Sequence, residues 1–121
     1  MIDKNFTYAI IGASNNSEKY GHRVMKDLLD AGYNVVPINP KEELILGLKT
    51  YHKLSDYPKK IDVAVFVVPP TVTEKIVDEV IELGIKNVWM QPGSENDEAI
   101  KKCEENKISF IHNACIMINK K

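Results

Sequence analysis

The residues of this chain best suited to chemistry form a short loop near the amino terminus. An apolar run over residues 8–11 ends on Gly12, Ala13 and Ser14, and Tyr20 and Gly21 open a helical segment shortly afterwards. A loop of this kind, between a buried strand and a helix, presents backbone N–H groups and the positive end of the helix to phosphate. No Gly-Lys-Ser/Thr follows, and no complete G-x-G-x-x-G is present. The pattern therefore predicts a site for a phosphorylated ligand without identifying that ligand.

A second candidate contact follows the next apolar run, at Asn39, Pro40 and Lys41. Sites for NAD generally place Asp or Glu at the end of this strand, where the carboxylate accepts a hydrogen bond from the ribose 2′-OH. A lysine favours a ligand with an additional phosphate on its ribose, such as NADP or coenzyme A (CoA). Lysine is also common on ordinary surfaces, so a solvated side chain is the alternative interpretation.

The other groups with catalytic potential do not form a catalytic or metal-binding pattern. His22, His52 and His112 stand far apart, without a paired acid or metal-ligand spacing. Cys103 falls on the apolar face of a predicted helix and is expected in the core. Cys115 follows the last predicted strand, as either a buried structural thiol or a thiol facing the ligand. The sequence supplies no nearby cation to lower its pKa, which favours the structural interpretation.

Length and composition indicate one soluble domain over residues 1–121. Hydrophobic residues make up 44% of the chain and charged residues 27%, as in ordinary globular proteins. The formal net charge of −1 gives no electrostatic case for nucleic acid or an anionic membrane. Two cysteines make no disulfide framework, and the amino terminus lacks the pattern of a signal peptide. We therefore expect a cytoplasmic protein.

Alternating apolar runs and helix-period segments predict an α/β fold: a Rossmann-like doubly wound parallel sheet of about five strands, with helices on both faces. Strands are expected at residues 7–12, 34–38, 61–68, 87–90 and 108–111. Helices are expected at residues 20–31, from a capping box of Thr71 and Glu74 to Gly84, and from a Ser94 cap to Asn106.

Two segments carry a weaker signal. Residues 41–58 are interpreted as a reduced crossover, with an extended piece near 49–51 and a helical turn near Leu54. The tail from residue 113 is interpreted as a loop whose apolar residues 115–118 dock on the sheet.

Right-handed crossovers place the five strands in the order two, one, three, four, five. In such sheets ligands bind beyond the carboxyl ends of the strands, where the chain reverses direction across the sheet. Four segments converge there, at residues 12–14, 39–41, 68–70 and 91–93. Gln91 leaves its strand at this rim, so its amide is a further candidate ligand contact.

Taken together, these motifs resemble the small stand-alone CoA-binding proteins and the CoA-binding domain of the succinyl-CoA synthetase α-subunit. The similarity is carried by IGAS at 11–14, GY at 32–33, VPINPK at 36–41, VVPP at 67–70, WMQPG at 89–93 and NACIM at 113–117. These motifs span nearly the whole chain in the family's order.

The resemblance implies a role for each segment of the site. Residues 12–14 would hold the pyrophosphate, and residues 39–41 would flank the adenosine and its 3′-phosphate. Val68, Pro69 and Pro70 would pack on the adenine. Related chains often have Arg-Pro-Ser where this chain has residues 19–21. The lost serine hydroxyl removes one phosphate donor, while the N–H of the glycine at position 21 remains.

The predicted function is binding of CoA or an acyl-CoA, with no evident catalytic residues and no metal. Two alternatives stay open: an NAD(P)-binding module, and a thiol-redox or acyl-transfer enzyme that uses Cys115. A third is a scaffold completed by a partner chain, although neither a protein partner nor a homodimer is indicated. Succinyl-CoA synthetase activity is not implied, because no histidine corresponds to that enzyme's phosphohistidine.

Overall fold

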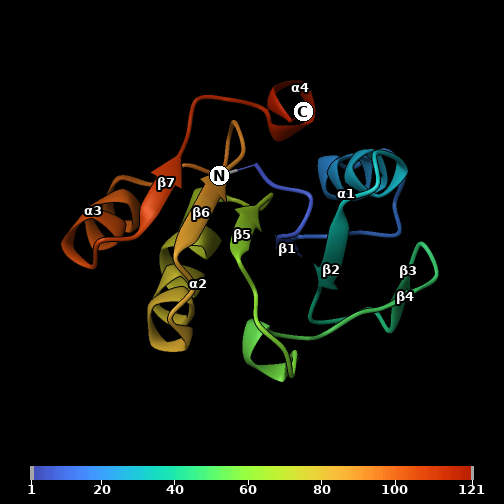
Figure 1. The fold of residues 1–121 in the computed structure, drawn as a ribbon, viewed down its shortest axis with the longest axis horizontal. Helices are drawn as coiled ribbons and strands as arrows, with labels where there is room; N and C mark the ends of the chain where they lie inside the picture. The colour runs from blue at the N-terminus through green and yellow to red at the C-terminus, as the bar shows by residue number, and fades with distance from the viewer. Residues whose placement is uncertain (1, 121) are drawn as a thin grey trace.

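A computed structural model describes residues 2–120 and contains a five-stranded parallel sheet in the order β2-β1-β5-β6-β7 (Figure 1). The strands are β1 (Thr7–Ile11), β2 (Asn34–Ile38), β5 (Val63–Phe66), β6 (Asn87–Met90) and β7 (Ser109–Ile111). The predicted class and strand order are confirmed. Each strand lies within two residues of its expected bounds at either end.

Helices cover both faces of the sheet. Helices α1 (Tyr20–Asp30) and α4 (Ile116–Asn119) lie on one face, and α2 (Pro70–Leu83) and α3 (Asp97–Glu105) lie on the other (Figure 1). Successive strand residues point to opposite faces. In β1, Tyr8 and Ile10 accordingly pack in the α1 core, while Ala9 and Ile11 pack in the α2–α3 core. This is a doubly wound, Rossmann-like fold.

Strand β5 is shorter than the apolar run that predicted it. All four of its residues are buried, as expected for a central parallel strand. Val67 N–H still donates to Ile11 C=O at 2.9 Å, but Val68 N–H donates to the Ser94 hydroxyl at 3.0 Å. The ladder therefore ends where a side chain replaces the neighbouring strand as acceptor.

The crossover from β2 to β5 contains a hairpin and one helical turn. Strands β3 (Leu44–Ile45) and β4 (Leu48–Lys49) pair antiparallel, and η1 (Leu54–Asp56) is a 3₁₀ turn. Between them, Tyr51 forms a bridge beside the end of β2, accepting from Asn39 N–H and donating to Pro37 C=O, both at 3.0 Å. The expected extended piece and helical turn are therefore present.

Both predicted helix caps are wrong. Helix α2 begins at Pro70 with Pro69 as its N-cap and no side-chain cap bond, because proline suits the first helical position without an N–H to satisfy. Thr71 is thus already inside the helix. Helix α3 is capped by Asn96, whose side chain accepts from Ala99 N–H at 2.9 Å. Ser94 lies two residues before this cap, and its hydroxyl accepts the hydrogen bond from Val68 N–H instead.

The expected docking of the tail is confirmed, with α4 as its helical part. Ile116 is fully buried in the α1 core, and the Trp89 indole N–H donates to Ala114 C=O at 2.8 Å. Trp89 is therefore a packing residue, as the sequence predicts. Lys120 forms an ion pair with Asp27 of α1 at 2.6 Å, which holds the end of the tail beside that helix.

Over residues 2–120, none of the helices combines the length and apolar character that crossing a membrane requires.

Candidate functional site

The strand register brings the predicted site segments to one edge of the sheet. Ile11 lies opposite Ile38 and Phe66, and Phe66 lies opposite Met90. The residues that follow these positions therefore emerge side by side at the carboxyl ends of the strands.

The first loop is held by backbone-to-backbone contact between two glycines. A methyl group on Gly21 would overlap Gly12 C=O and lie 2.8 Å from that carbonyl carbon. Gly12 has a φ of +96°, and a methyl group there would lie 2.8 Å from Val68 Cγ1 and overlap Val67 C=O. Only glycine fits at either position. The close approach brings the start of α1 against the end of β1.

The amino-terminal end of α1 is uncapped and opens into a cavity of about 330 Å³, here called the central cavity. His22 and Arg23 N–H both donate to Lys19 C=O, so the amides of Tyr20 and Gly21 precede the first helical bonds. The first turn carries no acidic residue. Partial positive charge therefore faces the cavity. Its lining is Gly12, Ser14, Lys19, Tyr20, Gly21, Asn39, Val67, Val68 and Pro69.

Two polar side chains hold the loop in place. Asn39 donates from Nδ2 to Ala13 C=O, and its Oδ1 accepts from Lys41 N–H, both at 2.8 Å. Asn15 donates to the Glu42 carboxylate at 2.6 Å, which ties the loop to the crossover. Asn39 thus acts first as a positioning residue for the loop carbonyl.

A second cavity of about 220 Å³, the α2-side cavity, shares Gly12 and Val68 with the central cavity. Its walls are mainly apolar, and exposed His52 and Lys53 stand on its rim. The full lining is Ile11, Gly12, Ile38, Pro40, His52, Lys53, Leu54, Val68, Val72, Ile76 and Glu79.

A third cavity of about 350 Å³, the α4-side cavity, shares Tyr20 and Val67 with the central cavity. It is lined by Tyr20, Val67, Gln91, Pro92, Cys115, Met117 and Ile118. Gln91 is 3% exposed, and its amide is engaged within the chain. Its Oε1 accepts from Ile116 N–H at 2.7 Å, and its Nε2 donates to Cys115 Sγ at 3.3 Å.

The structure thus distributes most of the sequence-predicted site residues over these three cavities, which share lining residues and are here together called the trough. Seven of them line the central cavity: Gly12, Ser14, Tyr20, Gly21, Asn39, Val68 and Pro69. Pro40 lines the α2-side cavity and Gln91 the α4-side cavity. Ala13 is buried, Lys41 is exposed beside Pro40, and Pro70 begins α2; these three are outside the cavity linings.

Sequence reasoning missed three basic residues at the trough. Lys19 lines the central cavity, and His52 and Lys53 border the α2-side cavity. Lys19 was detectable, because it directly precedes the helix whose first amides face the central cavity. The other two sit in the irregular crossover, whose path no sequence pattern specified.

The thiols and the remaining histidines lie in different environments. Burial raises the pKa of Cys103 to about 11, as expected for a core thiol. Cys115 is half-buried at the α4-side cavity. His22 Nδ1 lies 2.9 Å from Ser14 C=O, and His112 stacks on Phe110. Among residues 2–120, no His, Cys, Asp and Glu side chains gather as a metal site.

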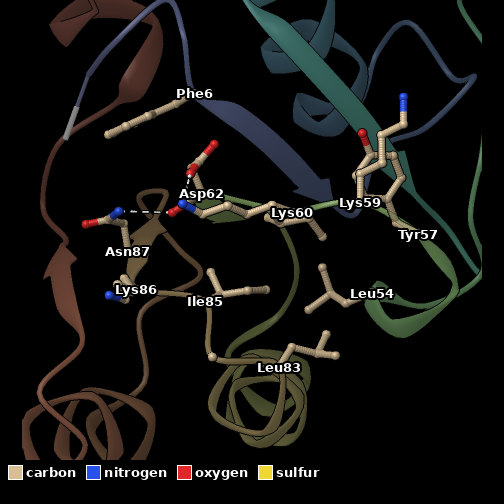
Figure 2. Close-up of a pocket in the computed structure, with 12 residues that line it drawn as sticks. Phe6, Leu54, Tyr57, Lys59, Lys60, Asp62, Leu83, Ile85, Lys86 and Asn87 are labelled. Atoms are coloured by element: carbon tan, nitrogen blue, oxygen red, sulfur yellow. Dashed lines mark hydrogen bonds and ion pairs between the residues drawn. The ribbon is translucent and has the colours of Figure 1, made fainter.

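Another cavity, of about 270 Å³, lies at the opposite edge of the sheet (Figure 2). Phe6, Ile61 and Lys86 line it just before their strands begin, and Leu83 closes α2 beside it. The Asn87 amide donates to Asp62 C=O at 3.0 Å, and both residues line this cavity (Figure 2). Because this edge lacks the glycine loop and the start of α1, the trough is the better candidate site.

Several known proteins are similar to this chain in sequence. An ADP-forming acetate–CoA ligase of Methanocaldococcus jannaschii is 44% identical over 78 residues, covering 64% of this chain and 11% of the ligase. The α subunit of acetate–CoA ligase (ADP-forming) II of Pyrococcus furiosus is 34% identical over 118 residues, covering 93% of this chain and 26% of the subunit. The chain therefore spans only a small part of these curated relatives.

The fold also matches a solved structure over nearly its full length. A conserved hypothetical protein from Pyrococcus furiosus superimposes with a TM-score of 0.91 at 41% identity, covering 95% of this chain and 99% of that one. The family model described as "CoA binding domain" matches residues 6–121. The chain therefore belongs to the CoA-binding domain family.

Proposed function

We propose that this chain binds CoA or an acyl-CoA in the trough, without catalysing a reaction by itself. The observation that carries the proposal is the uncapped start of α1, which faces the central cavity across the contact between Gly12 and Gly21. The N–H groups of Tyr20 and Gly21 and the Ser14 hydroxyl would donate to the diphosphate, with Lys19 as a counter-charge.

The adenosine would occupy the α2-side cavity, because its apolar walls adjoin the diphosphate position through Gly12 and Val68. Pro40 and Val68 would contact the adenine or ribose, with Pro69 and Pro70 at the edge. The 3′-phosphate would then lie near Lys53 on the rim of this cavity and near exposed Lys41, which follows Pro40; His52 on the same rim already contacts the Glu43 carboxylate at 3.1 Å. No acidic residue follows β2 directly, which favours CoA over NAD.

The ligase activity named for the curated relatives is not proposed for this chain. The chain covers 11% of the Methanocaldococcus jannaschii ligase and 26% of the Pyrococcus furiosus α subunit, and we assign no catalytic group in the trough. The binding step is the part of that chemistry that a CoA-binding domain supports.

Calorimetric titration with CoA, dephospho-CoA, NADH and NADPH tests the proposal directly. We expect CoA to bind more tightly than dephospho-CoA, and NADH to bind weakly or not at all. Tight NADH binding with no CoA binding would overturn the proposal.

The variant Lys41→Ala tests the 3′-phosphate contact. Because Lys41 is exposed, its contribution should be near the upper end for a surface ion pair, about 1 kcal/mol, or about fivefold in affinity for CoA. The affinity for dephospho-CoA should change by less than about twofold. Lys53→Ala should act in the same sense, and Lys101→Ala, an exposed lysine on α3, is the control. Equal losses for both ligands would contradict the assignment.

A further inference from the structure

We propose that a second copy of this chain docks its β3–β4 hairpin in the cavity at the opposite edge of the sheet, so that copies associate head to tail. This cavity, here called the opposite-edge cavity, is the one of about 270 Å³ shown in Figure 2. Residues 42–49 of the hairpin line none of the trough cavities, and the opposite-edge cavity shares only Leu54 with them. The inference therefore does not depend on the proposed binding of CoA.

The turn of the hairpin holds an apolar residue in a costly conformation. Ile45 pairs with Leu48, which leaves a two-residue turn. Leu46 has a φ of +49° and Gly47 a φ of +79°, so both turn residues are left-handed. Asn or Asp before Gly is the usual choice in such a turn, because a branched apolar side chain is strained there. Leu46 is also 39% exposed. Leucine at this tip does not favour the stability of the single chain, whereas a contact with another molecule would account for it.

The outer side of the hairpin is both apolar and acidic. Ile45 is buried in the α1 core, so the residues on either side of it point the other way. Leu44, one of these two, is 60% exposed. Glu42 and Glu43 directly precede it, and the Glu43 side chain is 84% exposed, with exposed His52 as its ion-pair partner. The hairpin therefore presents leucine side chains next to carboxylates.

The opposite-edge cavity has the complementary character. Its positive charge comes from Lys59, Lys60 and Lys86, and Asp62 is the one acidic residue in its lining. The Asp62 carboxylate already accepts from Thr7 N–H at 2.9 Å and pairs with Lys60 at 3.4 Å. Within residues 2–120, Lys59 and Lys86 have no ion-pair partner. The apolar residues of the lining are Phe6, Leu54, Tyr57, Ile61, Leu83 and Ile85.

The hairpin fits the cavity in size and in charge. An apolar cavity of roughly 150 Å³ already holds a benzene molecule, so about 270 Å³ admits a leucine side chain. Figure 2 shows Lys59 and Lys86 on opposite sides of the cavity, so the hairpin carboxylates would lie near an ammonium group on either side. Leu83, at the cavity, is itself 44% exposed. Burying Leu44 or Leu46 against it would remove apolar surface of both copies from water.

The contact is heterologous, because the hairpin and the cavity are different surfaces of the same chain. Such a contact can continue from one copy to the next. A single hairpin tip buries little surface, so we expect the association to be weak and to depend strongly on protein concentration.

Sedimentation velocity of the full chain without ligand measures the association, from about 10 µM to about 1 mM protein. We expect the average mass to rise over this range. The variant Leu46→Asn should weaken association by at least about tenfold, because it removes an apolar anchor. The same variant should keep or raise the urea-unfolding midpoint, because Asn before Gly suits this turn. Lys86→Glu should also weaken association, whereas Lys101→Glu, at an exposed lysine on α3, is the matched control and should leave it unchanged.

A mixture of the two weakened variants tests the head-to-tail geometry. Leu46→Asn keeps an intact cavity and Lys86→Glu keeps an intact hairpin. An equimolar mixture should therefore form a complex of one copy of each variant, although each variant alone stays largely monomeric. An unmodified chain that stays monomeric up to about 1 mM would overturn the inference. A Leu46→Asn chain that associates like the unmodified one would overturn it as well, and so would a mixture without the complex. Calorimetry with CoA reports on the proposed function separately from all of these outcomes.

Discussion

Replacing Gly21 with alanine tests whether the approach of α1 to β1 builds the diphosphate site. Helix propensity alone predicts that alanine would stabilise the chain by up to about 1 kcal/mol. The new methyl group, however, would overlap Gly12 C=O, which is backbone and cannot rotate away. Overpacking of this kind costs about 1–3 kcal/mol, so we expect a net loss of stability.

The same substitution should weaken the free energy of CoA binding by more than it lowers the free energy of unfolding. The loop must move away from α1 to admit the methyl group, which withdraws at least one amide from the diphosphate. A hydrogen bond to a charged group contributes about 1.5–3 kcal/mol, so affinity should fall by at least about tenfold. Urea unfolding and calorimetry with CoA measure the two effects separately.

The matched control for this experiment is Gly84→Ala at the end of α2. Gly84 has a φ of +71° and open space around it, so alanine there costs left-handed strain of about 1 kcal/mol without a clash. Gly84→Ala should therefore lose similar stability and keep its CoA affinity. A Gly21→Ala protein that is more stable than the unmodified chain and binds CoA equally well would refute the reasoning.

Four further tests probe other groups of the fold. Asn39→Asp keeps the acceptor for Lys41 N–H but loses the donor to Ala13 C=O and adds a negative charge, so CoA affinity should fall about tenfold by calorimetry. Gln91→Ala should lower the urea-unfolding free energy by about 1–3 kcal/mol, because it strands a buried N–H of α4; an unchanged midpoint would contradict this. Iodoacetamide at pH 8 should alkylate Cys115 and spare Cys103 in peptide mass spectra, because burial raises the pKa of Cys103 to about 11. The unfolded chain loses that proton near pH 9 and the folded chain keeps it, so stability should fall as pH rises from about 9 to 11.

The sheet could be predicted because runs of apolar residues mark its strands clearly. Residues 63–66 are buried on both faces, and the sequence there is uniformly apolar. The order of the strands then follows from the handedness of parallel crossovers. The predicted convergence of the first loop with residues 39–41 and 68–70 is a consequence of that order. Most of the residues that line the central cavity could therefore be predicted from the sequence.

The helix caps could not be predicted from the same signal. Thr71 and Glu74 satisfy the capping-box pattern, yet Pro69 and Pro70 start α2 earlier by conformational preference alone. Ser94 and Asn96 are both good capping residues two positions apart. The hydrogen bond of Val68 N–H to Ser94 decides between them, and that contact spans 26 residues of sequence.

The irregular crossover shapes the site as much as the regular elements do. Its hairpin packs Ile45 into the α1 core, whereas η1 packs Leu54 into the α2–α3 core. The segment therefore wraps around the β2 edge and touches both layers. The same segment contains Glu42, whose carboxylate accepts a hydrogen bond from Asn15 of the first loop. It also contains Lys53, whose side chain lies at the rim of the α2-side cavity.

This arrangement explains how a net charge of −1 is compatible with an anionic ligand. The lysines at or beside the trough come from separate segments: Lys19 directly before α1 and Lys53 in the crossover line its cavities, and Lys41 follows Pro40 after β2. The charge that a diphosphate and a 3′-phosphate require is therefore local, and the fold assembles it at one edge. Because all three lysines are exposed, salt screens their contribution, whereas the backbone amides at the start of α1 are fixed dipoles at short range. Raising ionic strength should accordingly weaken the preference for CoA over dephospho-CoA before it abolishes binding of the diphosphate.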